Sequence, residues 1–282
     1  MIERLAIVGI GLLGGSAAKA ARAGRLAREI VGIGRDRGRL EPAVADGTLD
    51  RATTDLAEGL GGADLVILAA PVLANEALLE HAWPLVDTGS IITDVGSTKA
   101  GLVRTARRLA ETRPLAFVGS HPMAGSEQSG YAIARADLFR GATVIVTPTD
   151  TTEPRALKTV SAFWEATGAR VATLEPETHD RVVAAISHLP HLVADALVDA
   201  VRRFEPAALD FAARGFRDTT RIAASDPVMW QEIFHGNRDS LLASLEAFRA
   251  ALDALEALVR RDDAAALRAT LDDIKRAREA VR

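Results

Sequence analysis

The stretch that decides the fold of this chain lies near its start, at residues 4–16, and reads Arg-Leu-Ala-Ile-Val-Gly-Ile-Gly-Leu-Leu-Gly-Gly-Ser. Its first part, residues 4–9, is a short apolar run that ends in glycine. An alanine-rich segment with helical character follows at once, from Leu12 to about Ala27. This order of a buried strand, a tight turn and a helix is typical of a nucleotide-binding α/β unit.

The glycines of this loop match the dinucleotide fingerprint in the setting that gives the pattern meaning. Gly9 permits the sharp turn, Gly11 lets the backbone approach a pyrophosphate, and Gly14 allows the helix to pack closely. The helix begins at Leu12 and Leu13, where free N–H groups and a partial positive charge would hold the phosphates. The sequence therefore predicts a dinucleotide cofactor bound by these five residues.

Short apolar runs continue through the first half of the chain, with helical segments between most of them. The further strands that we expect are Ile30–Ile33, Leu65–Ala70, Ile91–Val95, Ala116–Gly119, Thr143–Val146 and Arg170–Leu174. Strands that alternate with helices predict a parallel sheet covered on both faces. We therefore expect a Rossmann-type α/β fold in this half.

The strand pattern stops after Leu174, and the rest of the chain is expected to be all-helical. Within it, Pro190 removes a backbone hydrogen bond and should bend its helix. Breaks in the helical pattern are expected at Pro190, Pro206, Gly215, Pro227 and Gly236. We therefore divide the chain into a dinucleotide-binding domain, residues 1–174, and an all-helical substrate and dimerisation domain, residues 175–282.

The last two expected helices carry apolar side chains at alternating steps of four and three. The first seam consists of Leu241, Leu245, Phe248, Leu252, Leu255 and Val259, and the second of Leu267, Leu271 and Ile274. Such seams fit either an antiparallel helical pair within one core or the contact between two subunits. We expect a homodimer formed through these helices.

The composition is that of an ordinary globular protein and excludes several classes of function. Of the 282 residues, 48% are hydrophobic and 26% are charged, and the formal net charge of -4 argues against nucleic-acid binding. The absence of cysteine excludes disulfides, thiolate metal sites and a cysteine nucleophile. The longest near-apolar run, residues 65–74, is far shorter than the ~18 residues of a membrane span, and no signal peptide is visible. We therefore expect a cytoplasmic protein without nucleic-acid or membrane partners.

The end of the second expected strand bears on the choice of cofactor. An NAD site usually places an acidic residue there to hold the ribose hydroxyls, but here Gly34 and Arg35 follow the strand. An arginine in place of the carboxylate favours the 2′-phosphate of NADP, whereas Asp36 could still turn in and hold NAD. The sequence thus favours NADP, with NAD as the alternative.

Two polar clusters follow later strands of the expected sheet, at residues 94–99 and 119–127. Ligands of parallel sheets bind at the carboxyl ends of the strands, so both clusters should face the nicotinamide. An imidazole there, that of His121, can take a proton from an alcohol whose carbon gives up a hydride. Ser97 could hold either that imidazole or the substrate hydroxyl, and Asp94 is expected at the cofactor.

The helical half adds further histidines and a pair of arginines. His179, His188 and His191 are expected to line the same cleft as the first-half cluster. Metal binding by them is not expected, because no carboxylate at ligand spacing completes a site. Arg217 and Arg221 lie one helical turn apart, and either could bind a substrate carboxylate in a forked geometry.

Five short motifs stand in order along the chain. They are Gly-Ile-Gly-Leu-Leu-Gly-Gly-Ser from Gly9, Asp-Val-Gly-Ser-Thr-Lys from Asp94, His-Pro-Met-Ala-Gly from His121, Ser-His-Leu-Pro-His from Ser187 and Gly-Phe-Arg-Asp-Thr-Thr-Arg from Gly215. Together they resemble the prephenate/arogenate (cyclohexadienyl) dehydrogenase family of tyrosine biosynthesis, over essentially the whole chain. The resemblance implies an N-terminal nucleotide-binding domain, a C-terminal helical dimerisation domain arranged as in 6-phosphogluconate dehydrogenase, and an active site between them.

Carried over motif by motif, the resemblance assigns roles to individual residues. His121 would be the catalytic histidine, and Ser97 its hydrogen-bonding neighbour. Arg221 would hold a substrate carboxylate, while His191 and His188 would line the ring pocket. Ser126, Glu127 and Trp230 match positions near the substrate.

The activity that the resemblance implies is oxidative decarboxylation of prephenate to 4-hydroxyphenylpyruvate, or of arogenate to tyrosine, with hydride transfer to NAD(P)+. The two substrates differ only in a keto or an amino group on the side chain. Glu127 would favour the amine and His191 the keto acid, so both substrates stay open. Tyrosine could compete at the active site, but feedback through a separate domain is not expected, because the chain has no length for the regulatory or chorismate mutase domains of fused family members.

Two alternatives belong to other classes. An imine or hydroxyacid reductase of similar two-domain layout would not explain the His121 motif and the motif at residues 187–191 together. A non-catalytic nucleotide-sensing protein on the same fold would bind the cofactor without turnover.

Overall fold

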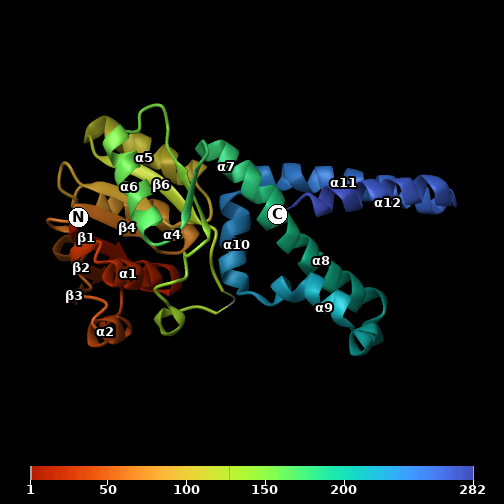
Figure 1. The fold of residues 1–282 in the computed structure, drawn as a ribbon, viewed down its shortest axis with the longest axis horizontal. Coiled ribbons are helices and arrows are strands. Elements are labelled where there is room, and N and C mark those ends of the chain that lie inside the picture. The colour runs from red at the N-terminus through yellow and green to blue at the C-terminus, as the bar shows by residue number, and fades with distance from the viewer. Residues whose placement is uncertain (1, 127, 282) are drawn as a thin grey trace.

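The structure is a computed structural model that describes residues 2–126 and 128–281. Figure 1 shows a half that contains the sheet and a helical half from which two arms project. The sheet has eight strands within the described residues, in the order β3-β2-β1-β4-β5-β6-β7-β8. The strands are β1 Ile2–Val8, β2 Ala27–Ile33, β3 Arg51–Thr53, β4 Leu65–Leu68, β5 Ile91–Asp94, β6 Ala116–Pro122, β7 Thr143–Thr147 and β8 Arg170–Thr173.

The strand order places this half among Rossmann-type folds, as the sequence predicted. The expectation of a parallel sheet is confirmed except at one place, where β6 and β7 pair antiparallel. Among the described residues between them the chain forms only a short 3₁₀ turn, Tyr131–Ile133, and a parallel return needs a crossover, usually a helix. Strand β3 was not predicted, since its three residues carry no apolar run.

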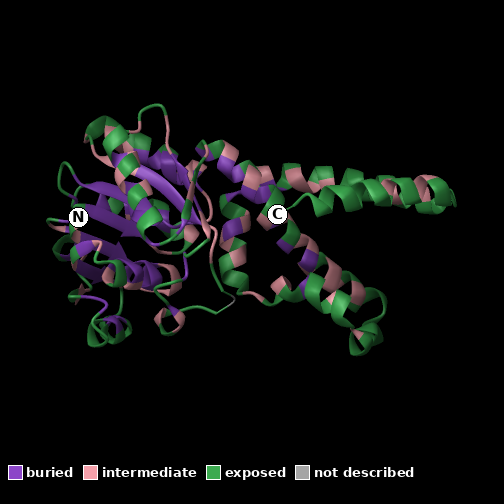
Figure 2. Ribbon diagram, in the orientation of Figure 1, coloured by how far each residue is buried: buried purple, intermediate pink, exposed green. Residues whose placement is uncertain are grey.

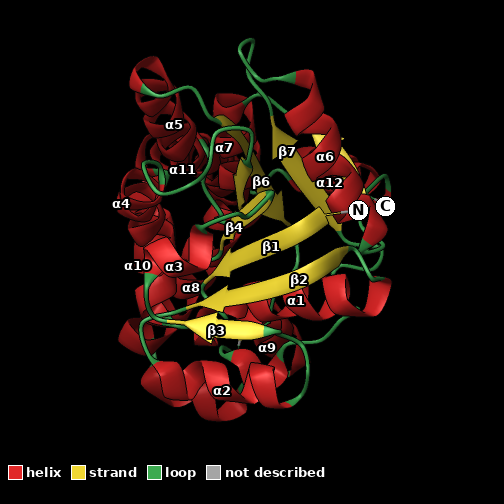
Figure 3. Ribbon diagram, turned by 90° about the vertical axis from the view of Figure 1, so that its left-hand side faces the viewer, coloured by secondary structure: helices red, strands yellow, loops and turns green. Residues whose placement is uncertain are grey.

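Apolar side chains on alternate positions of the strands pack on opposite faces of the sheet. In β1, Leu5 and Ile7 belong to one buried cluster, and Ala6 and Val8 to the other. Helices cover both faces (Figure 3). The helices of this half are α1 Leu12–Gly24, α2 Arg37–Ala45, α3 Leu56–Leu60, α4 Val72–Ala82, α5 Ala100–Thr112 and α6 Pro154–Ala166.

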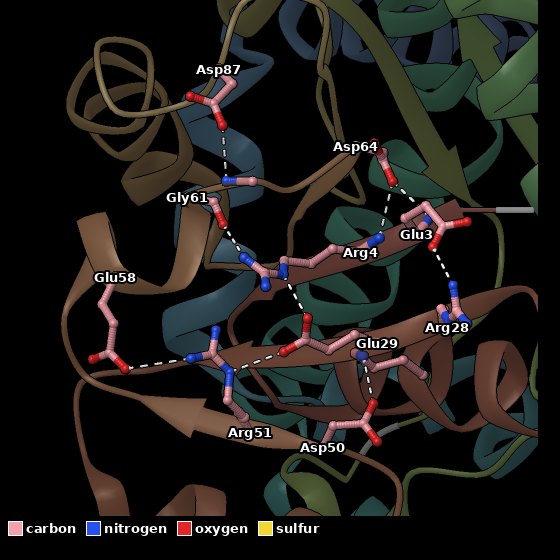
Figure 4. A network of polar contacts seen from close by, with 12 residues as sticks. Glu3, Arg4, Arg28, Glu29, Asp50, Arg51, Glu58, Gly61, Asp64 and Asp87 are labelled. Atoms are coloured by element: carbon pink, nitrogen blue, oxygen red, sulfur yellow. Dashed lines mark hydrogen bonds and ion pairs between the residues drawn. The ribbon is translucent and has the colours of Figure 1, made fainter.

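A polar network joins the amino-terminal ends of β1, β2 and β3 (Figure 4). Glu29 accepts hydrogen bonds from Arg4 at 2.7 Å and from Arg51 at 3.0 Å. The Asp64 carboxylate accepts from the backbone N–H groups of Glu3 and Arg4. Because these side chains are partly exposed, each ion pair adds little to stability, but the backbone contacts hold the strand ends together. The carboxyl ends of the strands, where the site lies, are left free of this network.

The helical half begins two residues after β8. Its elements are α7 Pro176–Val183, a π-helical turn Ala184–His188, α8 Leu189–Phe204, a 3₁₀ turn Pro206–Phe211, α9 Arg214–Thr220, a 3₁₀ turn Arg221–Ala224, α10 Pro227–Gly236, α11 Arg238–Arg260 and α12 Ala264–Glu279. The expected break at Gly215 is wrong, whereas near Pro190 the chain stays helical but its α-helical pattern is interrupted by the π turn. Pro190 lies in the first turn of α8, after a π turn in which Leu189 N–H donates to the carbonyl of Ala184. Gly215 lies inside α9.

Residues 176–204 form one continuous helical segment that is long and apolar enough to cross a membrane by length and composition. The segment contacts α5, β7 and α11 in the folded chain. It also carries four buried polar side chains, those of His179, Asp180, His188 and His191. These contacts and buried polar groups show that the segment packs in part against the rest of the folded chain, with 28% of its most apolar window buried.

Helices α11 and α12 form an antiparallel pair, one of the two arrangements that the seams allow, and the pair projects away from the rest of the molecule (Figure 1). Figure 2 shows burial concentrated in the sheet and exposed residues along this arm. Large apolar side chains on it are about half exposed, at 51% for Leu252, 50% for Leu271 and 49% for Ile274. A single chain therefore leaves much of the predicted seam in solvent.

Candidate active site

The glycine-rich loop after β1 has the geometry that its sequence predicts. Gly9 has a φ of +99°, and a side chain there would collide with the backbone of Ala69. A Cβ at Gly14 would collide with the carbonyl oxygen of Gly9, so the helix can approach the strand only without one. A Cβ at Gly11 would meet nothing within 4 Å, which leaves open space beside the helix start.

The amino terminus of α1 is free to hold an anion. No side chain caps it, and no acidic residue lies in its first turn, which starts with Leu12 and Leu13. Its N–H groups and partial positive charge therefore face the open space beside Gly11. The loop and the helix start thus fit the pyrophosphate of a dinucleotide.

The end of β2 carries exposed arginines. Arg35 is exposed directly after Gly34, two residues beyond the strand. The Asp36 carboxylate caps α2, where it accepts a hydrogen bond of 2.9 Å from the N–H of Gly38, and it lies 3.7 Å from Arg39. The carboxylate that could have served an adenosine ribose is therefore engaged elsewhere, and a guanidinium is available at this position.

Asp94 and Lys99 form a buried ion pair below the turn that follows β5. Both side chains are 0% exposed, and the Asp94 carboxylate also accepts N–H bonds from Gly96 at 2.8 Å and Ser120 at 3.1 Å. The carboxylate of Asp94 is therefore not open to a ligand, so any contact of Asp94 with the cofactor would involve its backbone. Its carboxylate is sealed in the protein, where it fixes the turn between β5 and α5 and the adjacent strand β6.

His121 lies near the carboxyl end of β6 and is 8% exposed. Its Nδ1 lies 2.9 Å from Nε2 of His179 on α7. The Nδ1 of His179 in turn lies 2.8 Å from the carboxylate of Asp180, which accepts backbone N–H bonds from Lys99 and Ala100. A line of three side chains thus runs from the sheet half into the helical half.

Ser97 does not hold the imidazole of His121 in the structure. Its side chain is partly exposed in the turn after β5, and no hydrogen bond joins it to His121 among the described residues. The neighbour of the imidazole is His179. Ser97 is left available for the substrate hydroxyl, the other role that the sequence allowed.

Burial determines the protonation of His121 and His188, which lie where the sheet half and the helical half meet. It lowers the pKa of His121 well below the ordinary value of 6.5, and the nearby His179, Lys99 and His188 lower it further. Burial also lowers the pKa of His188 to about 4, against an opposing effect of Asp180. Both imidazoles are therefore neutral at neutral pH, and His121 can accept a proton.

Asp180 is held as a carboxylate. Burial alone would raise the pKa of Asp180, but hydrogen bonds from His179 and from the N–H groups of Ala100 and Lys99 outweigh this effect and lower it. The two backbone donors lie at the amino terminus of α5, where the helix dipole also favours a negative charge.

A pocket of about 470 Å³ lies in the helical half. It is lined by His191, Asp195, Ala223, Ser225, Pro227, Trp230, Gln231, Phe234 and His235. The rings of His191 and Trp230 stack at 3.5 Å between centroids. His191 Nδ1 and Trp230 Nε1 are buried without a hydrogen-bond partner among the residues that the structure describes. Since buried polar atoms are nearly always paired, these two indicate a place for a polar ligand group.

The remaining predicted residues lie at the surface of this region or outside the description. Arg221 is exposed at the start of the 3₁₀ turn that leads to the pocket residue Ala223. Ser126 is exposed, and its hydroxyl accepts the N–H of Gln128 at 3.1 Å. Glu127 lies outside the described residues.

The structure brings together residues that the sequence did not assign to the site. His179 was expected in the cleft without a role, and Asp180, Lys99 and Asn237 were not singled out. Asn237 donates to the carbonyl of Asp180 at 2.6 Å and lies 3.2 Å from Nδ1 of His188. The adjacent His179-Asp180 pair was the only local signal, since the other contacts join positions far apart in the chain.

Two family models match successive parts of the chain. Residues 17–173 match the model described as prephenate dehydrogenase, nucleotide-binding domain. Residues 175–273 match the model described as prephenate dehydrogenase, dimerization domain. Together the matches leave residues 1–16, 174 and 274–282 outside them.

Individual relatives agree with the family models. A prephenate dehydrogenase of Bacillus subtilis is 37% identical over 94% of this chain and 72% of its own length. The solved prephenate dehydrogenase of Aquifex aeolicus, in complex with hydroxyphenyl propionate and NAD+, is similar with a TM-score of 0.93 and 34% identity, over 100% of this chain and 99% of that one. The arogenate dehydrogenase of Synechocystis is similar with a TM-score of 0.87 and 31% identity, over 98% and 99% of the two chains.

Proposed function

The chain belongs to the prephenate dehydrogenase family, and we propose that His121 is the base with which it catalyses its reaction. That reaction is the NAD(P)-linked oxidative decarboxylation of prephenate or arogenate in tyrosine biosynthesis. The observation that carries the assignment is a buried, neutral imidazole near the carboxyl end of β6, the strand end at which Rossmann-type folds bind their ligands.

The cofactor would lie against the glycine-rich loop. Gly9, Gly11 and Gly14, with the N–H groups that begin α1 at Leu12 and Leu13, would hold its pyrophosphate. When bound, the nicotinamide supplies the acceptor for a hydride. The cofactor that we propose is NADP, which is supported by the exposure of Arg35 after β2 and by the engagement of Asp36 as a helix cap.

His121 would carry the proton of the reaction. Its free ring nitrogen takes the proton of the substrate hydroxyl while the ring carbon that bears this hydroxyl gives up its hydride. The carbonyl that forms draws the electron pair of the ring–carboxylate bond into the ring, so carbon dioxide leaves and the ring becomes a phenolate. The proton on His121 can then return to the phenolate oxygen, which leaves the imidazole neutral for the next cycle. Ser97 would donate or accept at the same hydroxyl and orient it.

The helical half would hold the rest of the substrate. The unpartnered Nδ1 of His191 and Nε1 of Trp230 would meet polar groups of its side chain, with His188 lining the ring pocket. Arg221 would bind a carboxylate, and Ser126 and Glu127 would lie near the substrate. In this division, residues 1–174 hold the nucleotide and residues 175–282 close the site.

The half-exposed apolar seam of α11 and α12 would be covered by a second copy of the chain, which makes the protein a homodimer. The match to a dimerization-domain model supports this assembly. Tyrosine, which shares with the substrates a six-membered ring bearing a para oxygen and a side-chain carboxylate, would compete at the active site. We place the enzyme in the cytoplasm with the other enzymes of biosynthesis.

One assay tests the substrate and the cofactor together. Initial rates of nicotinamide reduction are measured with prephenate and with arogenate, each against NAD+ and NADP+, and kcat/KM is compared for the four pairs. We expect turnover of at least one substrate, release of one carbon dioxide per reduced cofactor, and a higher kcat/KM with NADP+. A strong preference for NAD+ would refute the role of Arg35, and cofactor binding without turnover of either substrate would refute the enzymatic function.

A further inference from the structure

We propose that His179 and Asp180, which come from the helical half, set the tautomer of His121 and so decide which of its ring nitrogens acts as the base. Both are positioning residues, since they act through His121. The proposal rests on the proposed role of His121. Its physical basis is a chain of hydrogen bonds from Asp180 through His179 to His121, in which the direction of each bond determines the direction of the next.

The line starts at Asp180, whose carboxylate can only accept. Its Oδ1 takes the N–H of Lys99 at 2.8 Å, and its Oδ2 takes the N–H of Ala100 at 2.9 Å. Backbone N–H groups are donors only, and they hold Asp180 as an acceptor on both oxygens. The contact of 2.8 Å between Asp180 Oδ1 and His179 Nδ1 must therefore be donated by the His179 ring.

The next step follows from the number of protons on a neutral imidazole. With its one N–H at Nδ1, a neutral His179 has a lone pair at Nε2. That atom lies 2.9 Å from Nδ1 of His121, so the hydrogen of this bond belongs to His121. A neutral His121 thus carries its proton at Nδ1 and has a bare Nε2. The bare nitrogen is the one that can accept the substrate proton.

The other groups around His121 do not compete for this bond. Lys99 Nζ is engaged by Asp94 beneath the turn. His188, on the π turn, has its Nδ1 3.2 Å from the amide nitrogen of Asn237. Among the described residues, therefore, only His179 contacts a ring nitrogen of His121.

The arrangement couples the base to the contact between the two halves. Lys99 and Ala100 of the sheet half hold the carboxylate of Asp180, and Asn237 of the helical half donates to its backbone carbonyl at 2.6 Å. His121 is thus given its tautomer only while α7 is seated against the start of α5. If the two halves separated, His121 would lose its hydrogen bond to His179, and its Nε2 would no longer be fixed as the proton acceptor.

A pair of matched variants separates this role from a structural one. In His179→Asn the shorter amide can still donate to Asp180 but cannot reach His121. In His179→Gln the longer amide can place its oxygen at the former Nε2 position and accept from His121. We expect kcat to fall ~100-fold or more in His179→Asn, as expected for a misplaced base, and to stay within about 10-fold in His179→Gln. Cofactor affinity, from a fluorescence titration, should be unchanged in both.

The pH dependence gives a second readout. Because a neutral His179 accepts the N–H at Nδ1 of His121 and so stabilises the protonated ring, the acid limb of the kcat–pH profile should move to lower pH in His179→Asn and stay near its wild-type position in His179→Gln. If the role of His179 were purely structural, both variants would lose kcat equally, and the loss would parallel the fall in melting temperature. Equal kcat values for His179→Asn and His179→Gln, or a wild-type kcat in His179→Asn, would overturn the proposal. If His121→Asn, described below, were fully active, the proposed function itself would fail, so the two failures are distinguishable.

Discussion

The substitution His121→Asn removes the base while it keeps the local hydrogen bond. The Asn amide nitrogen can occupy the position of ring Nδ1, 2.9 Å from Nε2 of His179, and donate to it. No atom replaces Nε2. Because a positioned general base contributes about 100- to 10,000-fold, we expect kcat to fall by that factor, which is about 2.7 to 5.4 kcal/mol in the activation free energy.

The control is His121→Leu, which removes the donor as well. It would leave the buried lone pair of His179 Nε2 unpaired, at a cost of about 1–3 kcal/mol in the free energy of unfolding. His121→Asn should stay within about 1 kcal/mol of the wild type, since it keeps that hydrogen bond. Chemical denaturation measures both values.

The decisive assay is single-turnover formation of reduced cofactor with the enzyme in excess over substrate. Both variants should bind the cofactor as the wild type does and fail in the chemical step. A single-turnover rate for His121→Asn within a few-fold of the wild type would refute the assignment of His121 as the base. A loss of activity explained entirely by weaker cofactor binding would do the same.

Three further predictions follow from other parts of the molecule. The pKa of His188 is lowered from 6.5 to about 4, so as the pH falls the unfolded chain takes up a proton at this residue before the folded chain does. The free energy of unfolding should therefore be independent of His188 protonation above pH 6.5 and should fall between pH 6.5 and pH 4, by at most about 3 kcal/mol. Urea denaturation over this range should show a smaller fall in His188→Gln. Gly11→Ala should lower the affinity for the cofactor and leave the melting temperature unchanged, whereas Gly14→Ala should lower both the affinity and the melting temperature. Titration measures the affinity, and calorimetry measures the melting temperature. The double substitution Leu271→Glu with Ile274→Glu should convert a dimer into monomers in sedimentation, and a monomeric wild type would contradict the proposed assembly.

The first half of the fold could be predicted because its signals are local. The glycine spacing of residues 9–14 and the continuous apolar strands specify a nucleotide-binding unit within short windows. Strand β3 escaped prediction because it is held by pairing with β2, which no pattern in its own three residues reveals. The antiparallel β7 escaped for a related reason, since strand direction depends on the connection and not on the strand itself.

The sequence singled out His121 as the candidate base but did not identify the residues that contact it. The position of His121 after an apolar run identified it as a candidate base. Its partner His179 lies 58 residues away, and Asp180 is held by a turn 80 residues earlier. Contacts over such distances depend on how the two halves meet, which a single sequence does not encode locally. The same limit explains Asp94, which the sequence placed at the cofactor and the fold buries beneath the turn.

The central claim is that His121 is neutral and presents a bare Nε2 to the substrate. Nitrogen NMR of the ligand-free enzyme, labelled at its histidine ring nitrogens and assigned with His121→Asn, measures this directly at neutral pH. We expect a proton on Nδ1 of His121, no proton on Nε2, and the loss of this tautomer in His179→Asn. A proton on Nε2 in the wild type would contradict the claim.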